Sequence, residues 1–259
     1  MDVYSDLYVR TNFINTDIDY LFNTEILEYD LRRAGLSLIK QFKLLPQSKI
    51  DSLSKMDKDP CNKEIGMLQK DKKFADRLLE CFTEARRMFF EANDIQKHEI
   101  VSIKKDAIFL TRRKCETTVF GELDFRIKNQ YLGYLRLNRI EFYYKDPNTV
   151  LDVKGLGPDV YLYHTDYMLD FIKDMISMAI YSPRQVLVNY FTKFILDYRK
   201  HNLAYGYYRQ MDHSNFYVVI DDEVGPMNIL DIDDGEDVTL DITYNYINYL
   251  IPMVNIFVA

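Results

Sequence analysis

The sequence predicts an α+β fold, and three observations lead to this prediction. Residues 24–30 and 100–110 are rich in Ile, Leu, Val, Tyr and Phe over strand-like lengths. Residues 69–93 repeat apolar side chains at helical spacing, which indicates an amphipathic helix of about seven turns. Two further helical patterns follow one another over 165–180 and from Ser182 to about residue 195, and they predict a helical hairpin.

The composition predicts a globular intracellular protein. Its 259 residues are 47% hydrophobic, enough for a sizeable core in one domain or in a main domain with a small appendage. The three cysteines are widely spaced and odd in number, which favours a reducing, cytoplasmic compartment. Because no apolar run reaches membrane-spanning length and no signal peptide is recognisable, neither a membrane partner nor secretion is expected.

Each of the two strand-like segments carries one aspartate. Asp30 closes the first segment, and Asp106 ends a polar interruption of the second, which predicts a hairpin with Asp106 at or beside its turn. If the two strands are neighbours, the carboxylates face one another at one edge of a sheet. Two carboxylates about 4 Å apart repel unless divalent cations lie between them. The alternative is that each aspartate is an ordinary turn or capping residue.

Four short motifs follow in an order that resembles the palm of family-B DNA polymerases, over about residues 20 to 200. The first is Asp30 with a turn, a serine seven residues later at Ser37, and a predicted helix. The hairpin with Asp106 is similar to the third motif of that family. Lys128-Asn-Gln-Tyr131 resembles the basic-plus-tyrosine element of the next palm strand, and Lys154-Gly155 resembles the pair that precedes the thumb.

The resemblance implies a metal-dependent nucleotidyltransferase that extends a nucleic-acid strand, as in DNA replication. Asp30 and Asp106 would be the catalytic residues and would hold two Mg²⁺ or Mn²⁺ ions. The partners would be a primer-template and nucleoside triphosphates, and Lys128, Tyr131 and Lys154 would contact the nucleic acid. The chain departs from the family at Gly35, where a tyrosine usually screens the sugar 2′ position, and at Lys104, where an acidic residue is usual. The finger motif that grips the triphosphate is not recognisable.

The implied architecture is a palm-like sheet with helical additions. It comprises a palm-like part over 1–158, a finger-like helical insertion at about 46–95, a thumb-like helical hairpin over 159–211, and a small acidic β-rich subdomain over 212–259. Within the insertion, Pro46, Pro60 and Gly66 predict that residues 46–67 are mainly a loop, with one short helix at 48–56.

Several cations are candidates for binding phosphate. Lys73, Arg77 and Arg87 lie on the helix predicted over 69–93 and would meet the triphosphate in place of the missing fingers. The alternative is that they pair with nearby acids at helical spacing. Arg112 and Arg113 follow the Asp106 strand and would contact a primer backbone, or they are edge-strand charges that discourage sheet pairing.

Charge is unevenly distributed along the chain. The net charge is −7, yet residues 30–114 hold 20 Lys or Arg against 13 Asp or Glu, so the cations collect in the half that contains both aspartates. Residues 212–259 hold ten acids and no Lys or Arg, and we expect this tail to form a surface for a protein partner. The alternative is that each half simply has its own solvated face.

Two other functions remain open from the sequence. The departures from the polymerase pattern fit a binding or interaction protein descended from a polymerase, in which the catalytic machinery has decayed. A metal-dependent nuclease would require a further carboxylate, and Glu28 has the strand parity to share a face with Asp30.

Overall fold

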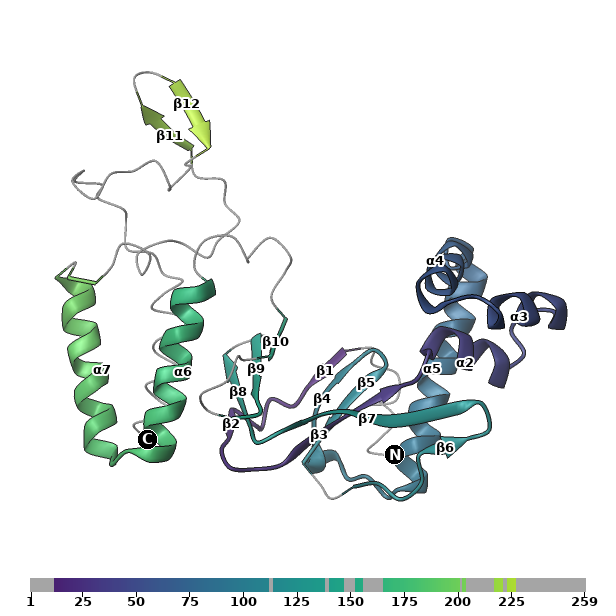
Figure 1. The fold of residues 1–259 in the computed structure, drawn as a ribbon, viewed down its shortest axis with the longest axis horizontal. Helices are drawn as coiled ribbons and strands as arrows, with labels where there is room; N and C mark the ends of the chain where they lie inside the picture. The colour runs from purple at the N-terminus through teal and green to yellow at the C-terminus, as the bar shows by residue number, and fades with distance from the viewer. Residues whose placement is uncertain are drawn as a thin grey trace. The chain divides into compact units, whose positions relative to one another are not determined.

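The computed structural model describes residues 12–111, 114–137, 140–146, 152–155, 165–200, 202–203, 217–220 and 223–226. These residues form helices and antiparallel sheets, so the predicted α+β class is confirmed (Figure 1). The chain divides into two compact units, Met1–Gly133 and Tyr134–Ala259. Within the described ranges, no helix is both long enough and apolar enough to cross a membrane.

A six-stranded sheet is the centre of the first unit. Its strands follow the spatial order β1-β4-β5-β3-β7-β6, and each neighbouring pair is antiparallel. Their bounds are β1 Asn12–Ile14, β3 Ile26–Leu31, β4 Ile100–Lys104, β5 Ala107–Leu110, β6 Val119–Phe120 and β7 Leu123–Tyr131. Strand β2 (Tyr20–Leu21) precedes β3 in the chain.

Helices α2 (Ala34–Gln41), α3 (Gln47–Ser54), α4 (Lys58–Leu68) and α5 (Lys72–Ala92) share one hydrophobic core with this sheet. A 3₁₀ turn at Lys97–Glu99 leads from α5 to β4. In helix α5, the Phe89 ring lies 5.2 Å from that of Tyr29 in β3 and 4.5 Å from that of Phe125 in β7. The long amphipathic helix is therefore the main cover of the sheet, as its apolar spacing predicts.

Alternation along β3 decides which side chains reach the helices. Leu27, Tyr29 and Leu31 are buried in the core cluster shared with the helices. Because successive side chains of a strand point to opposite faces, Glu28 and Asp30 lie on the other face of the sheet. The strand that carries Asp30 is thus anchored by apolar residues on one face and presents carboxylates on the other.

In the segment 46–67, the short helix predicted at 48–56 is confirmed as α3, but the remainder predicted as a loop is mostly helix α4, so that part of the prediction is wrong. Helix α4 begins at Lys58, which makes Pro60 its third residue, a position whose N–H has no intrahelical partner to lose. Cys61 and Ile65, four residues apart, bury one face of α4 in the core. Pro60 is therefore tolerated in the first turn, and burial of this face outweighs the weak helix propensity of Gly66.

The second unit contains strands and a helical hairpin. Strand β8 (Gly133–Leu137) begins at the division, β9 (Ile140–Tyr144) pairs antiparallel with β10 (Asp152–Lys154), and β11 (Tyr217–Ile220) pairs antiparallel with β12 (Glu223–Pro226). Helices α6 (Thr165–Tyr181) and α7 (Arg184–Arg199) pack through Phe171 and Phe194, whose rings lie 4.3 Å apart. The helical hairpin is confirmed, whereas most of the acidic tail lies outside the described residues.

Candidate functional site

Strand pairing brings Asp30 and Asp106 to the same edge. Strand β3 lies antiparallel to β5, with Asp30 opposite Ala107, the residue after Asp106. Asp106 lies in the two-residue turn between β4 and β5, where Lys104 pairs with Ala107 and Lys105 takes a positive φ of 57°. The backbone N–H of Leu31 donates to the Asp106 carbonyl at 3.3 Å. The structure therefore joins two aspartates that are far apart in sequence.

The electrostatic surroundings of Asp106 include Asp30. Burial raises the pKa of Asp106, and the negative charge of Asp30 raises it further. A hydrogen bond with its own backbone and the cations Lys105 and Lys128 oppose this rise. A partly buried acid beside a second acid favours any positive charge that can come between them.

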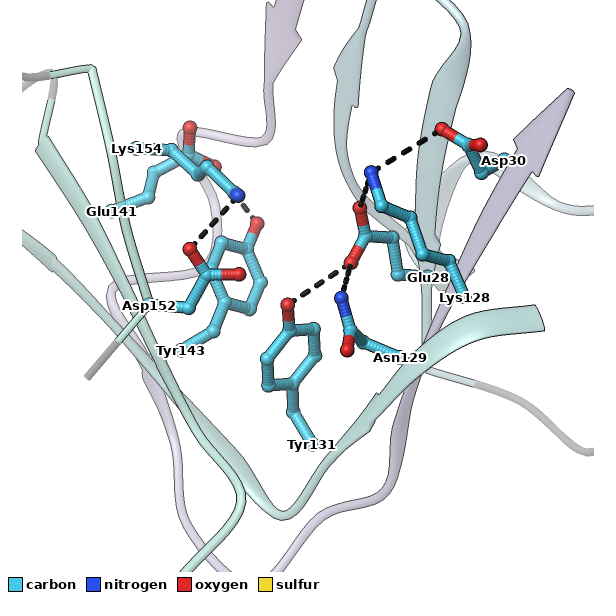
Figure 2. A network of polar contacts seen from close by, with 9 residues as sticks. All are labelled: Glu28, Asp30, Lys128, Asn129, Tyr131, Glu141, Tyr143, Asp152 and Lys154. Atoms are coloured by element: carbon cyan, nitrogen blue, oxygen red, sulfur yellow. Dashed lines mark hydrogen bonds and ion pairs between the residues drawn. The ribbon is translucent and has the colours of Figure 1, made fainter. Parts of the chain in front are cut away.

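Lys128 of strand β7 lies beside Asp30, between its carboxylate and that of Glu28. Its Nζ lies 3.5 Å from Asp30 Oδ1 and 3.5 Å from Glu28 Oε1, so the ammonium bridges the two carboxylates (Figure 2). Partial burial disfavours the charged form, but the charges of Asp30 and Glu28 outweigh it and raise the pKa of Lys128. The Lys128 side chain is 51% exposed, so its charged end remains within reach of solvent.

Glu28 is buried and fully engaged. Its residue is 1% exposed, and its Oε2 accepts hydrogen bonds from Asn129 Nδ2 at 2.6 Å and from Tyr131 Oη at 3.0 Å. Together with the Lys128 ion pair, these contacts satisfy both carboxylate oxygens. Glu28 therefore holds its neighbours in place and has little capacity left to act as a third metal ligand.

A pocket of about 760 Å³ opens beside the aspartate pair within the first unit. Its wall combines Asp30 and Asp106 with the β3–α2 turn, helix α4 and strand β7. Six cationic side chains and three acidic ones line it, which leaves an excess of positive charge. The cations are Arg32, Arg33, Lys58, Lys105, Arg126 and Lys128, and the third acid is Asp57.

The pocket cations differ in what already binds them. Arg33 donates to the Met56 carbonyl at 2.8 Å, and Arg32 lies 3.8 Å from Asp124 in an exposed ion pair. Among the described residues, Lys58, Lys105 and Arg126 take part in no ion pair, but the Lys105 ammonium lies over the Phe82 ring. Lys58 and Arg126 are therefore the most available for an anionic ligand.

Arg86 supports the Asp106 turn from the helix side of the sheet. It is 2% exposed, and its Nη1 donates to the Lys105 carbonyl at 2.9 Å. Burial lowers the pKa of this guanidinium to about 10, so it remains protonated at neutral pH. A buried arginine that bonds the residue before Asp106 ties the position of that carboxylate to helix α5.

The predicted phosphate-binding residues of α5 do not line this pocket. Lys73 and Arg77 are exposed, and Arg87 forms ion pairs with Glu84 and Glu91 on its own helix. The Arg87 geometry matches the alternative of surface pairing at helical spacing. Arg112 and Arg113 lie outside the described residues.

The residues expected to contact nucleic acid have different surroundings. Lys128 lies at the site, whereas Tyr131 is 1% exposed and donates to Glu28. Lys154 belongs to the second unit, where its Nζ lies 2.9 Å from Asp152 (Figure 2). Direct contact of Tyr131 and Lys154 with nucleic acid therefore stays a prediction.

Gly35 lines the pocket at the start of α2. A Cβ at this position would lie 3.2 Å from Ile65 Cδ1 of helix α4, closer than ordinary packing. A larger side chain would push α4 away or enter the pocket. The glycine noted as a departure from the polymerase pattern thus keeps α2 and α4 close together.

The site offers few protein ligands to a metal ion. Within the ranges that the structure describes, no group of three or more His, Cys, Asp or Glu side chains is arranged to hold one. Asp30 on strand β3 and Asp106 in the adjacent β4–β5 turn supply two carboxylates, which are the hard oxygen ligands that Mg²⁺ and Mn²⁺ favour. Mg²⁺ is commonly bound by one or two carboxylates, with substrate phosphates and water completing its shell. The pair therefore fits a divalent cation in that manner.

Some pocket residues had a signal in the sequence. Arg32 and Arg33 directly follow Asp30 in the chain. Arg126 lies two residues before Lys128, so strand alternation could have placed it on the same face as Lys128. Lys58 had no such signal because its helix was expected to be a loop. Arg86 and Arg87 are neighbours of the same type, and only tertiary packing distinguishes the buried one from the exposed one.

Fold and site together define an α+β protein with a cationic pocket next to a pair of aspartates. The chain belongs to the family of the bacteriophage PBS1 gene 130 protein, whose model matches residues 2–259. A comparison with curated proteins finds no match.

Proposed function

We propose that this protein is a metal-dependent nucleotidyltransferase that adds nucleotides to a nucleic-acid strand. The observation that carries the proposal is that Asp30 and Asp106, from adjacent segments, line one cationic pocket. Its volume of about 760 Å³ is in the range of pockets that bind small molecules, and its positive excess suits a triphosphate. The order of motifs that resembles a polymerase palm supports the same reaction.

Each part of the site has a role in this reaction. The 3′-hydroxyl oxygen of the strand bonds to the α-phosphorus, the bond to the leaving diphosphate breaks, and the hydroxyl proton passes to solvent. Asp30 and Asp106 would hold Mg²⁺ or Mn²⁺, which lowers the pKa of the attacking hydroxyl and neutralises the leaving diphosphate. Lys58 and Arg126 would orient the phosphates and offset their charge.

A primer-extension assay tests the proposal. Purified protein is given a primed template, labelled ribo- or deoxyribonucleoside triphosphates, and Mg²⁺ or Mn²⁺. We expect incorporation, and we expect Asp30→Asn and Asp106→Asn each to lower it about 10²-fold or more, since a metal contributes several kcal/mol of transition-state stabilisation. Asp76→Asn, an exposed change outside the pocket, serves as the control. Near-normal incorporation by either site variant would refute the assignment.

A binding protein without catalysis is the second candidate. The specific observation in its favour is the Lys128 ammonium, which already neutralises Asp30. In this case the pocket binds nucleotides, but no conditions of metal or template yield incorporation. Equilibrium binding of a labelled triphosphate, measured beside the extension assay, separates the two functions.

A further inference from the structure

The aspartate pair lies beside a cation that belongs to the chain. Two carboxylates that share a site require positive charge between them or beside them. In a site with two metal ions, both positive centres are metals. Here the Lys128 ammonium lies 3.5 Å from Asp30 Oδ1 and 3.5 Å from Glu28 Oε1, so the chain itself supplies one positive charge beside Asp30 (Figure 2).

A β-bulge directs Lys128 to this position. Tyr29 pairs with Ile127 and Glu28 pairs with Asn129, so Lys128 is an extra residue opposite the β3 backbone. Such an insertion changes the alternation of a strand and can re-aim a side chain. As a result, the consecutive residues Lys128 and Asn129 both contact Glu28.

The buried Glu28 carboxylate holds Lys128 through an ion pair. Its side chain is 2% exposed, whereas that of Lys128 is 51% exposed. The buried carboxylate is held by Asn129 and Tyr131, so it cannot turn away to solvent without breaking both hydrogen bonds. The ammonium is therefore anchored at a buried charge and remains in contact with Asp30.

From this geometry we propose that Lys128, positioned by Glu28, replaces one of the two metal ions, and that Asp30 and Asp106 bind a single divalent cation. The inference rests on the proposed metal-dependent function and specifies how that site is built. The shortage of carboxylate ligands among the described residues agrees with it, because two carboxylates serve one ion better than two. Lys128 is a positioning and charge-supplying residue in this arrangement.

Calorimetric titration of the full chain with Mn²⁺, in the absence of nucleotide, tests the proposal without any activity measurement. The wild-type protein should bind one Mn²⁺ per chain at this site, and Asp30→Asn should abolish that binding. Lys128→Met should bind Mn²⁺ about tenfold more tightly or take up a second ion, because a nearby positive charge is lost. Lys128→Arg keeps the charge and should stay close to wild type.

Lys63→Met is the matched control. It also removes one positive charge, but Lys63 is exposed and lies outside the pocket. We expect a change in Mn²⁺ affinity of about threefold or less, since a charge away from the site is screened. Circular dichroism of each variant confirms that it is folded.

The outcomes separate this inference from the proposed function. Two Mn²⁺ ions in the wild type, or a Lys128→Met protein with unchanged binding, would overturn the inference and leave the nucleotidyltransferase intact. A protein that shows the expected Mn²⁺ behaviour but incorporates no nucleotide would keep the inference and reject the function. No binding of Mn²⁺ by the wild type in the absence of nucleotide would overturn the inference, whereas the extension assay alone decides the function.

Discussion

At the level of single residues, the availability of Lys58 and Arg126 decides how the pocket meets an anion. Both line the pocket, and neither takes part in an ion pair among the described residues. A charge-assisted hydrogen bond to phosphate contributes about 1.5–3 kcal/mol. We therefore expect Lys58→Gln and Arg126→Gln each to weaken triphosphate binding about tenfold, as measured by fluorescence with a labelled nucleotide. Lys70→Gln, an exposed change outside the pocket, should have no effect, and equal losses in all three variants would contradict the assignment.

Ionisation of Asp106 makes the stability of the fold depend on pH. Burial and the neighbouring Asp30 raise its pKa, so the folded protein holds this proton more tightly than the unfolded chain does. The resulting stability is present at low pH and is lost as pH rises through the folded-state pKa. Asp106→Asn mimics the protonated acid and retains that stability at neutral pH.

The pH prediction is tested by melting curves in a chelating buffer. We expect Asp106→Asn to melt at a higher temperature than the wild type at pH 8, and we expect the difference to shrink towards about pH 4, near the ordinary pKa of an aspartate. Asp76→Asn controls for the loss of a surface charge. A variant that melts below the wild type at pH 8 would show that the ionised form of Asp106 stabilises the fold.

Among the elements, the β4–β5 hairpin depends on helix α5. The buried Arg86 guanidinium donates to the Lys105 carbonyl, and Arg86→Met would leave that carbonyl without this donor. Loss of one partner of a buried hydrogen bond costs about 1–3 kcal/mol. We therefore expect a decrease of about 2 kcal/mol in the free energy of unfolding, measured by urea denaturation.

The adjacent residue provides the control for this hairpin prediction. Arg87→Met removes the same side chain one position later, where it makes only partly exposed ion pairs with Glu84 and Glu91. Exposed pairs of this kind contribute about 0–1 kcal/mol. Equal losses for the two variants would mean that the Arg86 hydrogen bond gives the hairpin no special support.

The elements also show what could be predicted from the sequence. The strand that ends near Asp30, the hairpin of Asp106 and helix α5 follow from apolar spacing, which burial enforces directly. Helix α4 was missed because Pro60 and Gly66 are read as breakers, although Pro60 lies in a first turn that tolerates it. The bulge at Lys128 leaves no local pattern, because it depends on how β7 pairs with β3. The residues that surround the two aspartates were therefore harder to predict than the aspartates themselves.

For the molecule as a whole, local and net charge have opposite signs. The chain carries −7 overall, while the pocket is lined by six cationic and three acidic side chains. At physiological ionic strength, exposed charges are screened beyond about 8 Å, so a bound strand responds mainly to the pocket. Affinity for nucleic acid should therefore follow the number of phosphates that the pocket cations neutralise, despite the net negative charge.

This balance predicts the salt dependence of strand binding. We take the positive excess of the pocket to neutralise three phosphates of a single strand. Each neutralised phosphate contributes about −0.7 to the slope of log affinity against log salt concentration, so the affinity should fall about 20-fold between 50 and 200 mM KCl. The measurement is fluorescence anisotropy of a labelled oligonucleotide. The double variant Lys58→Gln/Arg126→Gln should make the slope shallower by about 1.4. Lys63→Gln/Lys70→Gln removes the same charge from exposed positions outside the pocket and should leave the slope unchanged. An identical slope in both double variants would place the strand elsewhere on the molecule, because counterion release reports only the phosphates that are actually neutralised.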